Sequence, residues 1–407
     1  MTEITQKTAS NSPADNSPAE VFTTFLKLGC SSFGGPIAHI GYFRKELVER
    51  RKWITEGQFT QLLAICQFLP GPTSSQLGFS LGLARAGWPG ALAAFIAFTL
   101  PSALLLVGFA FLSHLLIGSF VQSAVHGLKI VAFAVVADAV LGMAKKLCPD
   151  IHRASLALLA ACLLIFLAND YWIQLLVVIG GGIGGILMVK SASAEPLLHL
   201  PFGYSKKIAG MLLLVFFALL IGLPLLAFDN TGLAPLADAF YRAGALVFGG
   251  GHVVLPLLED SVVSSGWVAK ETFLAGYGAS QAIPGPMFAF SAYLGAAIPT
   301  GENAWLGATV ALLFIFLPGF LLIAAVVPFW QSVADSIIAN NAIAGINAAV
   351  VGLLGAALYD PIFTSAILSL MDMAIGVVAL AMLSVWRLSV LTVVAWCTVM
   401  SMLASLF

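Results

Sequence analysis

The chain has 407 residues, of which 60% are hydrophobic and 9% charged, and its formal net charge is −1. A soluble domain carries about 25% charged residues, so this composition excludes a soluble globular protein. Roughly 20 apolar residues span a bilayer as a helix, and a membrane β-barrel would show short alternating segments instead. The sequence therefore predicts an all-α polytopic protein of the bacterial inner membrane, with no nucleic-acid partner.

Apolar segments long enough to cross or enter a bilayer follow one another along the chain. Residues 1–20 differ, because they are rich in Ser, Thr, Asn and Pro and lack the apolar core of a signal peptide. We expect a disordered tail there. We count about thirteen apolar segments, at residues 21–43, 58–84, 88–112, 118–143, 154–168, 171–189, 208–228, 238–258, 272–298, 303–328, 341–369, 373–386 and 388–407.

One block of sequence occurs twice within these apolar segments. Residues 25–72 contain FLKLGCSSFGGP, a Trp and QFLPGP, and residues 240–286 contain FYRAGALVFGGG, a Trp and QAIPGP. The offset is 215 residues at Phe33 and Phe248 and 214 at the Trp and the PGP. A duplicated membrane unit whose helices are broken by Gly and Pro is typical of a secondary transporter's central site.

Positive charge predicts how the first copy enters the membrane, because Lys and Arg mark the cytoplasmic side. Three apolar segments separate the basic residues at 44–52 from those at 145–153. One of the three must return to the side it came from, and 58–84, broken at Pro70-Gly71-Pro72, is the best candidate for such a re-entrant hairpin. Arg85 then also lies inside. The alternative is that all thirteen segments cross and the basic loops violate the rule.

The second copy carries the opposite charge at the corresponding loop. Arg44 aligns with Glu259 and Lys45 with Asp260, as two inverted-topology repeats require. Segments 21–43 and 238–258 are then hairpins broken at their glycines, with the breaks near the midplane. We expect four regions: a tail over 1–20, an N-terminal transport repeat over 21–190, a linker with a connecting transmembrane helix over 191–230, and an inverted C-terminal repeat over 231–407.

The breaks are the first candidate for a binding site. Pro36, Pro72 and Pro286 stand where the first residue of a new half-helix is expected. Free N–H groups and the positive dipole end of such a helix bind anions, and irregular backbone at membrane depth survives where it lines a cavity. The alternative is that GGP and PGP are kinks that only pack helices closely.

Two cations align between the copies and lie beside these breaks. Lys27 and Arg242 each precede a Phe-Gly-Gly by six residues, with no carboxylate expected in the same half-helix to neutralise either. A buried cation costs a few kcal/mol unless it pairs or faces a cavity, so we expect both to coordinate an anion. Snorkelling of Lys27 to the headgroups, and hydroxyls that bond back into their own helices, are the alternatives.

The remaining polar residues near the breaks complete the candidate site. We expect His39 and His252 to make satisfied polar contacts rather than to bind a metal, and we expect no cofactor. The candidate substrate-binding residues are Lys27, Ser31, Ser32, Gly34, Gly35, Pro36, Gln67, Pro70, Gly71, Pro72, Thr73, Arg242, Gly249, Gly250, Gly251, His252, Gln281, Pro284, Gly285 and Pro286.

Two further patterns have ambiguous or structural interpretations. Lys129 and Asp138 share one apolar segment and could pair or relay protons. The glycine run at 180–185 superficially resembles a dinucleotide loop, but inside an apolar helix it predicts close helix packing.

The two halves resemble the chromate ion transporter superfamily in its long, two-domain form. SFGGPIAHIGYFRKELVERRKW and QFLPGP are similar to that family's N-terminal motifs, and FGGGHVVLPLLE and QAIPGP to its C-terminal ones. The resemblance covers residues 21–407 and implies an inner-membrane protein that expels chromate and confers resistance to it. Its motif residues are Phe33, Gly34, Gly35, Pro36, Pro70, Gly71, Pro72, Phe248, Gly249, Gly250, Gly251, Pro256, Pro284, Gly285 and Pro286.

Membrane energetics also favour export of a dianion. One elementary charge is worth about 2.3 kcal/mol per 100 mV, so a dianion leaving a negative interior gains about 4.6 kcal/mol per 100 mV. We therefore expect a secondary transporter, not an enzyme, for chromate or a sulfate-like oxyanion, with membrane lipid and a second copy in a homodimer as the other candidate partners. The alternatives are transport of sulfate or another oxyanion, an intramembrane enzyme that acts on lipid carriers, and a membrane scaffold.

Overall fold

The computed structural model describes residues 17–33, 35–113, 119–167, 171–189, 204–227, 232–248, 254–330 and 336–404. Within these ranges every regular element is a helix. Five helices are long and apolar enough to cross a membrane, and five shorter apolar helices accompany them. The prediction of an all-α polytopic membrane protein is therefore confirmed.

The first copy of the repeat begins with α1 and ends with α7, and α8 follows it. Ser17 caps α1 by accepting a hydrogen bond from Glu20 N at 3.2 Å, so the helix starts inside the tail predicted over 1–20. The elements are α1 (Pro18–Ser31), α2 (Gly35–Phe43), the π-helical η1 (Arg44–Arg50), α3 (Glu56–Phe68), α4 (Thr73–Ser113), α5 (Ser119–Leu147), α6 (Ile151–Phe166), α7 (Tyr171–Met188) and α8 (Lys206–Leu226).

The second copy repeats this order after the connecting helix α8. A π-helical segment again follows a short α-helix, at η3 as at η1. The elements are α9 (Leu233–Leu246), α10 (Val254–Glu259), η3 (Asp260–Ser264), α11 (Lys270–Ala282), η4 (Met287–Ala289), α12 (Phe290–Ala297), α13 (Ala304–Val326), η5 (Val327–Phe329), α15 (Ile337–Ala357), η6 (Leu358–Phe363), α16 (Thr364–Ala366), α17 (Leu370–Ser384) and α18 (Val390–Ala404).

Both PGP motifs break the chain between two helices, as predicted. α3 ends at Phe68 before α4 begins, and α11 ends at Ala282 before η4 begins. Gly71 and Gly285 take φ of +124° and +101°, a region that favours glycine. We expected Pro72 and Pro286 to be the first residues of the new helices. Each instead stands one position before its helix begins.

The first two hairpins return to the end from which they start. Glu20, near the start of α1, pairs with Arg51 just beyond η1 at 3.2 Å and with Arg85 of α4 at 3.0 Å. After Arg85 the backbone leaves helical geometry at Ala86 (φ −139°) and Gly87 (φ +64°), so α4 is two helices joined at a kink. Arg85 therefore lies with the basic residues of the first copy, as the charge pattern predicts.

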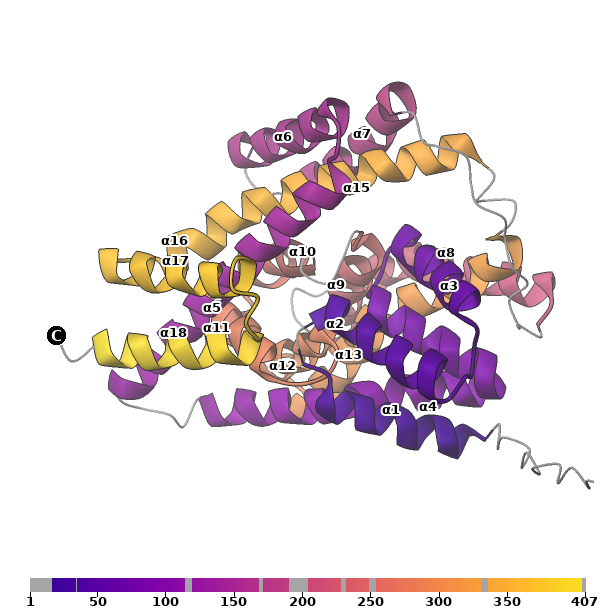
Figure 1. The fold of residues 1–407 in the computed structure, drawn as a ribbon, viewed down its shortest axis with the longest axis horizontal. Helices are drawn as coiled ribbons and strands as arrows, with labels where there is room; N and C mark the ends of the chain where they lie inside the picture. Colours follow the sequence, from indigo (N-terminus) through magenta and orange to yellow (C-terminus); the bar gives the residue numbers. More distant parts are fainter. Residues whose placement is uncertain are drawn as a thin grey trace, which may run out of the picture.

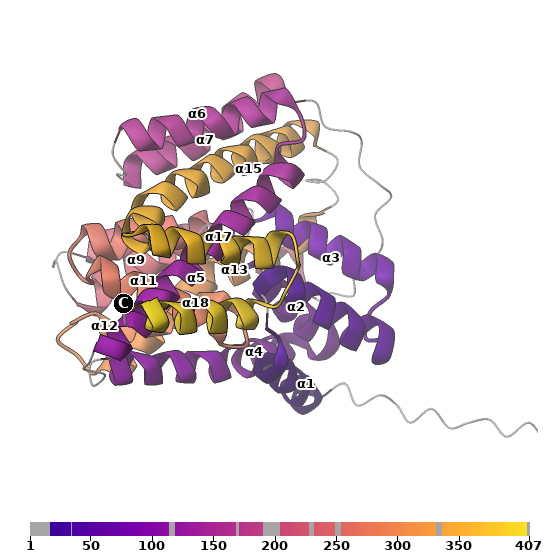
Figure 2. The same ribbon diagram turned by 60° about the vertical axis from the view of Figure 1, so that its left-hand side comes forward.

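The last two helices of each copy pack against a helix of the other copy. Figures 1 and 2 show α6 and α7 beside α15 of the second copy, while α17 and α18 lie along α5 of the first. Glycines make the α7–α15 contact close, because a Cβ on Gly181 would lie 2.5 Å from Ala349 Cβ and one on Gly185 would lie 2.8 Å from Gly345 Cα. The prediction that the glycine run at 180–185 packs helices is confirmed.

The connecting helix α8 lies against α9 and gives the two copies different surroundings. Tyr241 Oη on α9 donates a hydrogen bond to Phe216 O on α8 at 2.9 Å. The core itself lies beside the breaks, where Phe25, Phe43 and Phe98 are fully or almost fully buried and pack edge to face. At the two PGP motifs, Gly71, Pro72 and Gly285 are likewise buried inside packed protein.

Candidate functional site

Two hydrogen bonds join the breaks of one copy to the breaks of the other. Gly71 N, in the first PGP, donates to Val247 O at the end of α9 at 2.6 Å. Gly285 N, in the second PGP, donates to Ser32 O at the end of α1 at 2.9 Å. The offsets are 214 residues between the donors and 215 between the acceptors, so these are the same contact made twice. We call the Ser32–Gly285 contact the first junction and the Val247–Gly71 contact the second junction.

A buried histidine completes the first junction. His39 is fully buried, with Nε2 at 3.2 Å from Ser32 O and Nδ1 at 3.4 Å from Ser74 Oγ. A carbonyl oxygen only accepts, so in the neutral ring Nε2 donates to Ser32 O and Nδ1 accepts from Ser74. The imidazole therefore links the end of α1 to the start of α4. The prediction that His39 makes satisfied polar contacts is confirmed.

A buried glutamine completes the second junction. Gln76 Nε2 donates to Pro70 O at 2.9 Å and to Gly319 O at 3.0 Å, which ties the first PGP to α13 of the second copy. Sequence reasoning missed Gln76. The signal was available, because an amide inside an apolar segment, shortly after a break, needs a polar partner.

Both PGP glycines approach a helix of the other copy so closely that a side chain would collide. A Cβ on Gly71 would lie 2.9 Å from Gly319 Cα, and a Cβ on Gly285 would lie 2.7 Å from Ser102 Oγ. Ser102 and Gly319 each follow a proline inside a long helix, Pro101 in α4 and Pro318 in α13. The close approach, like the junctions, is therefore made once from each copy.

Hydroxyl groups without partners lie at and near these junctions. Ser32 Oγ, Ser75 Oγ and Thr99 Oγ1 are buried and make no hydrogen bond among the described residues. Leaving a buried polar group unsatisfied costs about 1–3 kcal/mol, so each such group calls for an explanation. Hydroxyl donors with backbone N–H groups of a helix start form the kind of environment that holds an oxyanion.

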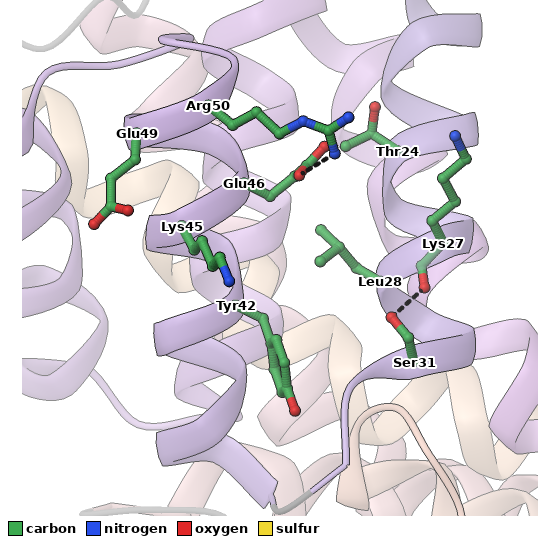
Figure 3. Close-up of a pocket in the computed structure, with 9 residues that line it drawn as sticks. All are labelled: Thr24, Lys27, Leu28, Ser31, Tyr42, Lys45, Glu46, Glu49 and Arg50. Carbon is green, nitrogen blue, oxygen red and sulfur yellow. Dashed lines mark hydrogen bonds and ion pairs between the residues drawn. The ribbon is translucent and has the colours of Figure 1, made fainter.

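Lys27 lies beside the first break but is exposed rather than buried, contrary to prediction. Its side chain lines a cavity of about 590 Å³ between α1 and the α2–η1 arm. Figure 3 shows this cavity, which we call the basic groove. Ser31 lines it too, and its hydroxyl bonds back to Lys27 O at 2.7 Å within α1. The basic groove is lined by Lys27, Ser31, Tyr42, Lys45, Glu46 and Arg50, among others.

Arg242 has different surroundings from Lys27. It forms an ion pair with Asp238 one helical turn earlier in α9, and the Asp238 side chain is only 6% exposed. The expectation that no carboxylate in the same half-helix neutralises Arg242 is therefore wrong. The i,i+4 spacing of Asp238 and Arg242 in the sequence already indicated that the two side chains lie on the same face of a helix and can pair.

The other predicted residues fall into several groups. Gln67 is exposed, whereas Gln281 Nε2 donates to Ser280 Oγ at 3.2 Å and lies 3.3 Å from Met287 Sδ, so the two glutamines are not equivalent. Thr73 Oγ1 donates to Cys66 O across the first PGP at 3.4 Å. Gly35 and Pro36 are the first two residues of α2. Pro70, Pro284 and the other residues of the two PGP motifs flank the junctions. Gly34, Gly249, Gly250, Gly251 and His252 lie outside the described residues.

Two groups considered as a proton relay do not pair. Lys129 and Asp138 both lie on α5, and nine residues of helix separate them by about 13 Å. Among the described residues no ion pair joins them.

No group of three or more His, Cys, Asp or Glu that could hold a metal occurs in the described part of the chain.

Comparison with known proteins gives a consistent result. The family model described as "Chromate transporter" matches the chain twice, over residues 19–186 and 234–402. The chain is 28% identical over 390 residues to the chromate transport protein of Pseudomonas aeruginosa, covering 95% of this chain and 91% of that protein. It is 28% identical over 367 residues to the probable chromate transport protein of Synechococcus elongatus, covering 89% and 88%.

A third relative, the chromate transport protein of Cupriavidus metallidurans, is 28% identical over 339 residues, covering 81% of this chain and 78% of that protein. No solved structure matches the chain. The two regions matched by the family model start 215 residues apart, the same spacing that separates the two junction carbonyls. The family model matches both halves of the chain, and the motifs of both halves lie at the junctions. The chain therefore belongs to the chromate transporter family.

Proposed function

We propose that this protein exports chromate, a divalent tetrahedral oxyanion, across the bacterial inner membrane, driven by the membrane potential, and so confers chromate resistance. The junctions between the two copies form the binding site. The two copies have inverted topology and alternate access by rocking against each other around the hairpin tips. Membership of the chromate transporter family supports the cargo.

The observation that carries the proposal is the pair of repeat-related hydrogen bonds, Gly71 N to Val247 O and Gly285 N to Ser32 O. They bring the broken ends of four half-helices together. A two-fold arrangement of broken helices around a midplane site is the design of many secondary transporters. The exchange of α6 and α7 for α17 and α18 supports the same symmetry, since each copy completes the other.

The donors at the first junction suit an oxyanion. Ser32 and Ser75 bring hydroxyls without partners, and the start of α4 brings N–H groups that the helix itself leaves free. The polar side chains that the described residues place there are hydroxyl and imidazole groups rather than carboxylates. A dianion held there meets donors and no fixed negative charge.

The direction follows from the charge of the cargo. With a negative interior, an outward dianion gains about 4.6 kcal/mol per 100 mV, which supports about a 2,000-fold gradient without a coupling ion. Inward movement would have to overcome the same free energy through cotransport.

The test is chromate flux into proteoliposomes under an imposed potential, with sulfate as competitor. Flux should rise with the potential that drives the dianion, and Ser32→Ala and Ser75→Ala should each lower apparent affinity about tenfold, the value of a hydrogen bond to a charged group. Ser384→Ala is the matched control, because that hydroxyl is exposed and bonded back to Leu380 O.

The melting temperature separates a binding role from a structural one. Removing a buried hydroxyl that has no partner should leave stability unchanged or raise it, while flux falls. Reduced stability with unaltered flux would contradict the assignment. Flux that sulfate fully replaces at equal concentration would make sulfate, not chromate, the preferred cargo.

A further inference from the structure

The basic groove is a large cavity of the first copy, bordered by charged side chains, that the junctions do not explain. It has a volume of about 590 Å³, whereas one water occupies about 30 Å³, so it is large enough for a hydrated ion. Three cations and two carboxylates line it. Such a surface cannot face acyl chains, because each exposed charge there would cost several kcal/mol.

The groove runs from the charged end of the first hairpin to the first break. Figure 3 shows Glu49 and Arg50 at one end, and Tyr42 and Ser31 at the other, beside the loop that connects the two helices. Ser31 directly precedes Ser32, whose carbonyl accepts the hydrogen bond of the first junction. The groove therefore ends one residue away from the proposed binding site.

The carboxylates of the groove are already neutralised by arginines. Glu46 accepts from Arg51 at 2.7 Å and from Arg50 at 3.0 Å. Burial would raise the pKa of Glu46, but these hydrogen bonds hold it below its usual value, so the carboxylate stays ionised and keeps the arginines engaged. Glu49 lies 3.7 Å from Arg44.

Two lysines remain as the cations that the groove can offer to a ligand. Neither Lys27 nor Lys45 takes part in an ion pair among the described residues, and both line the cavity, one from each wall. Figure 3 shows Lys45 and Lys27 on the two helices that lie on either side of the groove. Two ammonium groups without carboxylate partners match the charge of one dianion.

The second copy does not repeat most of the side chains that line the groove. The counterparts of Lys45, Arg50 and Tyr42 are Asp260, Ser265 and Leu257. Leu257 is 4% exposed. The connecting helix α8, which has no counterpart in the first copy, packs against α9. Two of the three cations that line the groove are therefore not repeated at the corresponding positions of the second copy.

We infer that the basic groove is the site at which the divalent oxyanion is first captured, so that Lys27 and Lys45 load the transporter from the basic face. The inference rests on the proposed function and adds to it a second, peripheral binding site that speeds loading from the basic face. Capture by exposed lysines acts on the rate of association and weakens with salt, because a Debye length is about 8 Å at physiological ionic strength.

The experiment measures chromate uptake into inverted membrane vesicles, whose exposed face is the basic one, for wild type, Lys45→Gln, Lys45→Arg and Lys146→Gln. Lys146 is the matched control, since it is an exposed lysine at the end of α5, away from the groove. Lys45→Gln should raise KM about tenfold at low salt with kcat unchanged, and less at high salt. Lys45→Arg should retain the wild-type KM.

A second arm distinguishes the free ion from a lipid headgroup, which offers the same phosphate-like chemistry. The effect of Lys45→Gln should be equal in proteoliposomes of phosphatidylcholine alone and of phosphatidylcholine with phosphatidylglycerol. An effect confined to the anionic liposomes would assign the groove to lipid and overturn the inference. Equal KM for Lys45→Gln and Lys146→Gln, with wild-type flux intact, would also overturn it while leaving the proposed function standing. Absence of wild-type flux would instead refute the proposed function.

Discussion

The close approach of the two PGP glycines gives the sharpest quantitative prediction. Gly71→Ala puts a Cβ 2.8 Å from Gln76 Nε2 and 2.9 Å from Gly319 Cα, at a φ of +124°. The backbone conformation costs an L-residue about 1–2 kcal/mol, and the forced contact adds about 1–3 kcal/mol. Gln76 can shift, but the α13 backbone cannot do so without moving the helix. We expect a total of about 2–5 kcal/mol.

A matched control separates the two contributions. Gly266 has a φ of +77° with nothing within 4 Å of the added Cβ, so Gly266→Ala carries the backbone cost alone, about 1–2 kcal/mol. The corresponding position of the first copy is Lys52, at a φ of +53°, so a side chain is tolerated in this conformation. The difference between the two variants measures the close approach at the junction.

Thermal unfolding of the purified protein in detergent and chromate flux in vesicles are the two assays. Gly71→Ala should unfold several degrees below Gly266→Ala and lose most of its flux, because the shifted α13 no longer holds the second junction. Gly285→Ala should behave like Gly71→Ala, since its Cβ would lie 2.7 Å from Ser102 Oγ. If both junction variants matched Gly266→Ala in melting temperature and flux, the contact between the copies would not be as described.

Three further predictions concern the breaks, the topology and a buried acid. Pro72→Ala and Pro286→Ala free the backbone before each new helix, so both should lower flux several-fold, and clearly unequal losses would argue against equivalent use of the two copies. Single cysteines at Val48 and Val263, in a background without the native cysteines, should be labelled from opposite faces of the membrane; labelling from one face would exclude inversion. Burial raises the pKa of Glu259 from 4.5 to about 7, against the opposing effect of Lys270. The folded state therefore binds this proton more tightly, and its stabilisation is lost as pH rises through about 7. Glu259→Gln should flatten the fall in melting temperature between pH 5 and 8, and an unchanged slope would show that another group causes it.

Local chemistry explains why so much of the fold could be predicted. The helix α3 ends just before Pro70-Gly71-Pro72, whatever packs around it, because proline lacks an N–H and glycine supplies the positive φ. The glycine run of α7 predicts close packing for the same local reason, as Gly181 shows against α15. Even the return of α4 to the basic end was readable from the charge rule, since three apolar segments separate the basic residues at 44–52 from those at 145–153 and one of them must turn back.

The candidate site was predicted less well, since its residues act through partners far apart in sequence. Lys27 and Arg242 align, yet Lys27 is exposed in a groove while Arg242 pairs with Asp238. The ion pair of Arg242 was readable from its i,i+4 spacing to Asp238, whereas the exposure of Lys27 depends on which helices pack against α1. Gln76 was overlooked because its partner, Gly319 O, lies 243 residues away.

The sequence by itself determined that the chain is a duplicated, all-α membrane protein, where each helix breaks, and that the two copies carry opposite charge at matching loops. These properties depend on composition, on proline and glycine, and on spacing along one chain. Only the tertiary structure decided that the break of each copy contacts the break of the other. It also decided that His39 and Gln76 form hydrogen bonds at those contacts, and that Lys27 and Lys45 line one groove. Such contacts depend on which helices pack together in space, and a periodic pattern of apolar residues is compatible with many packings.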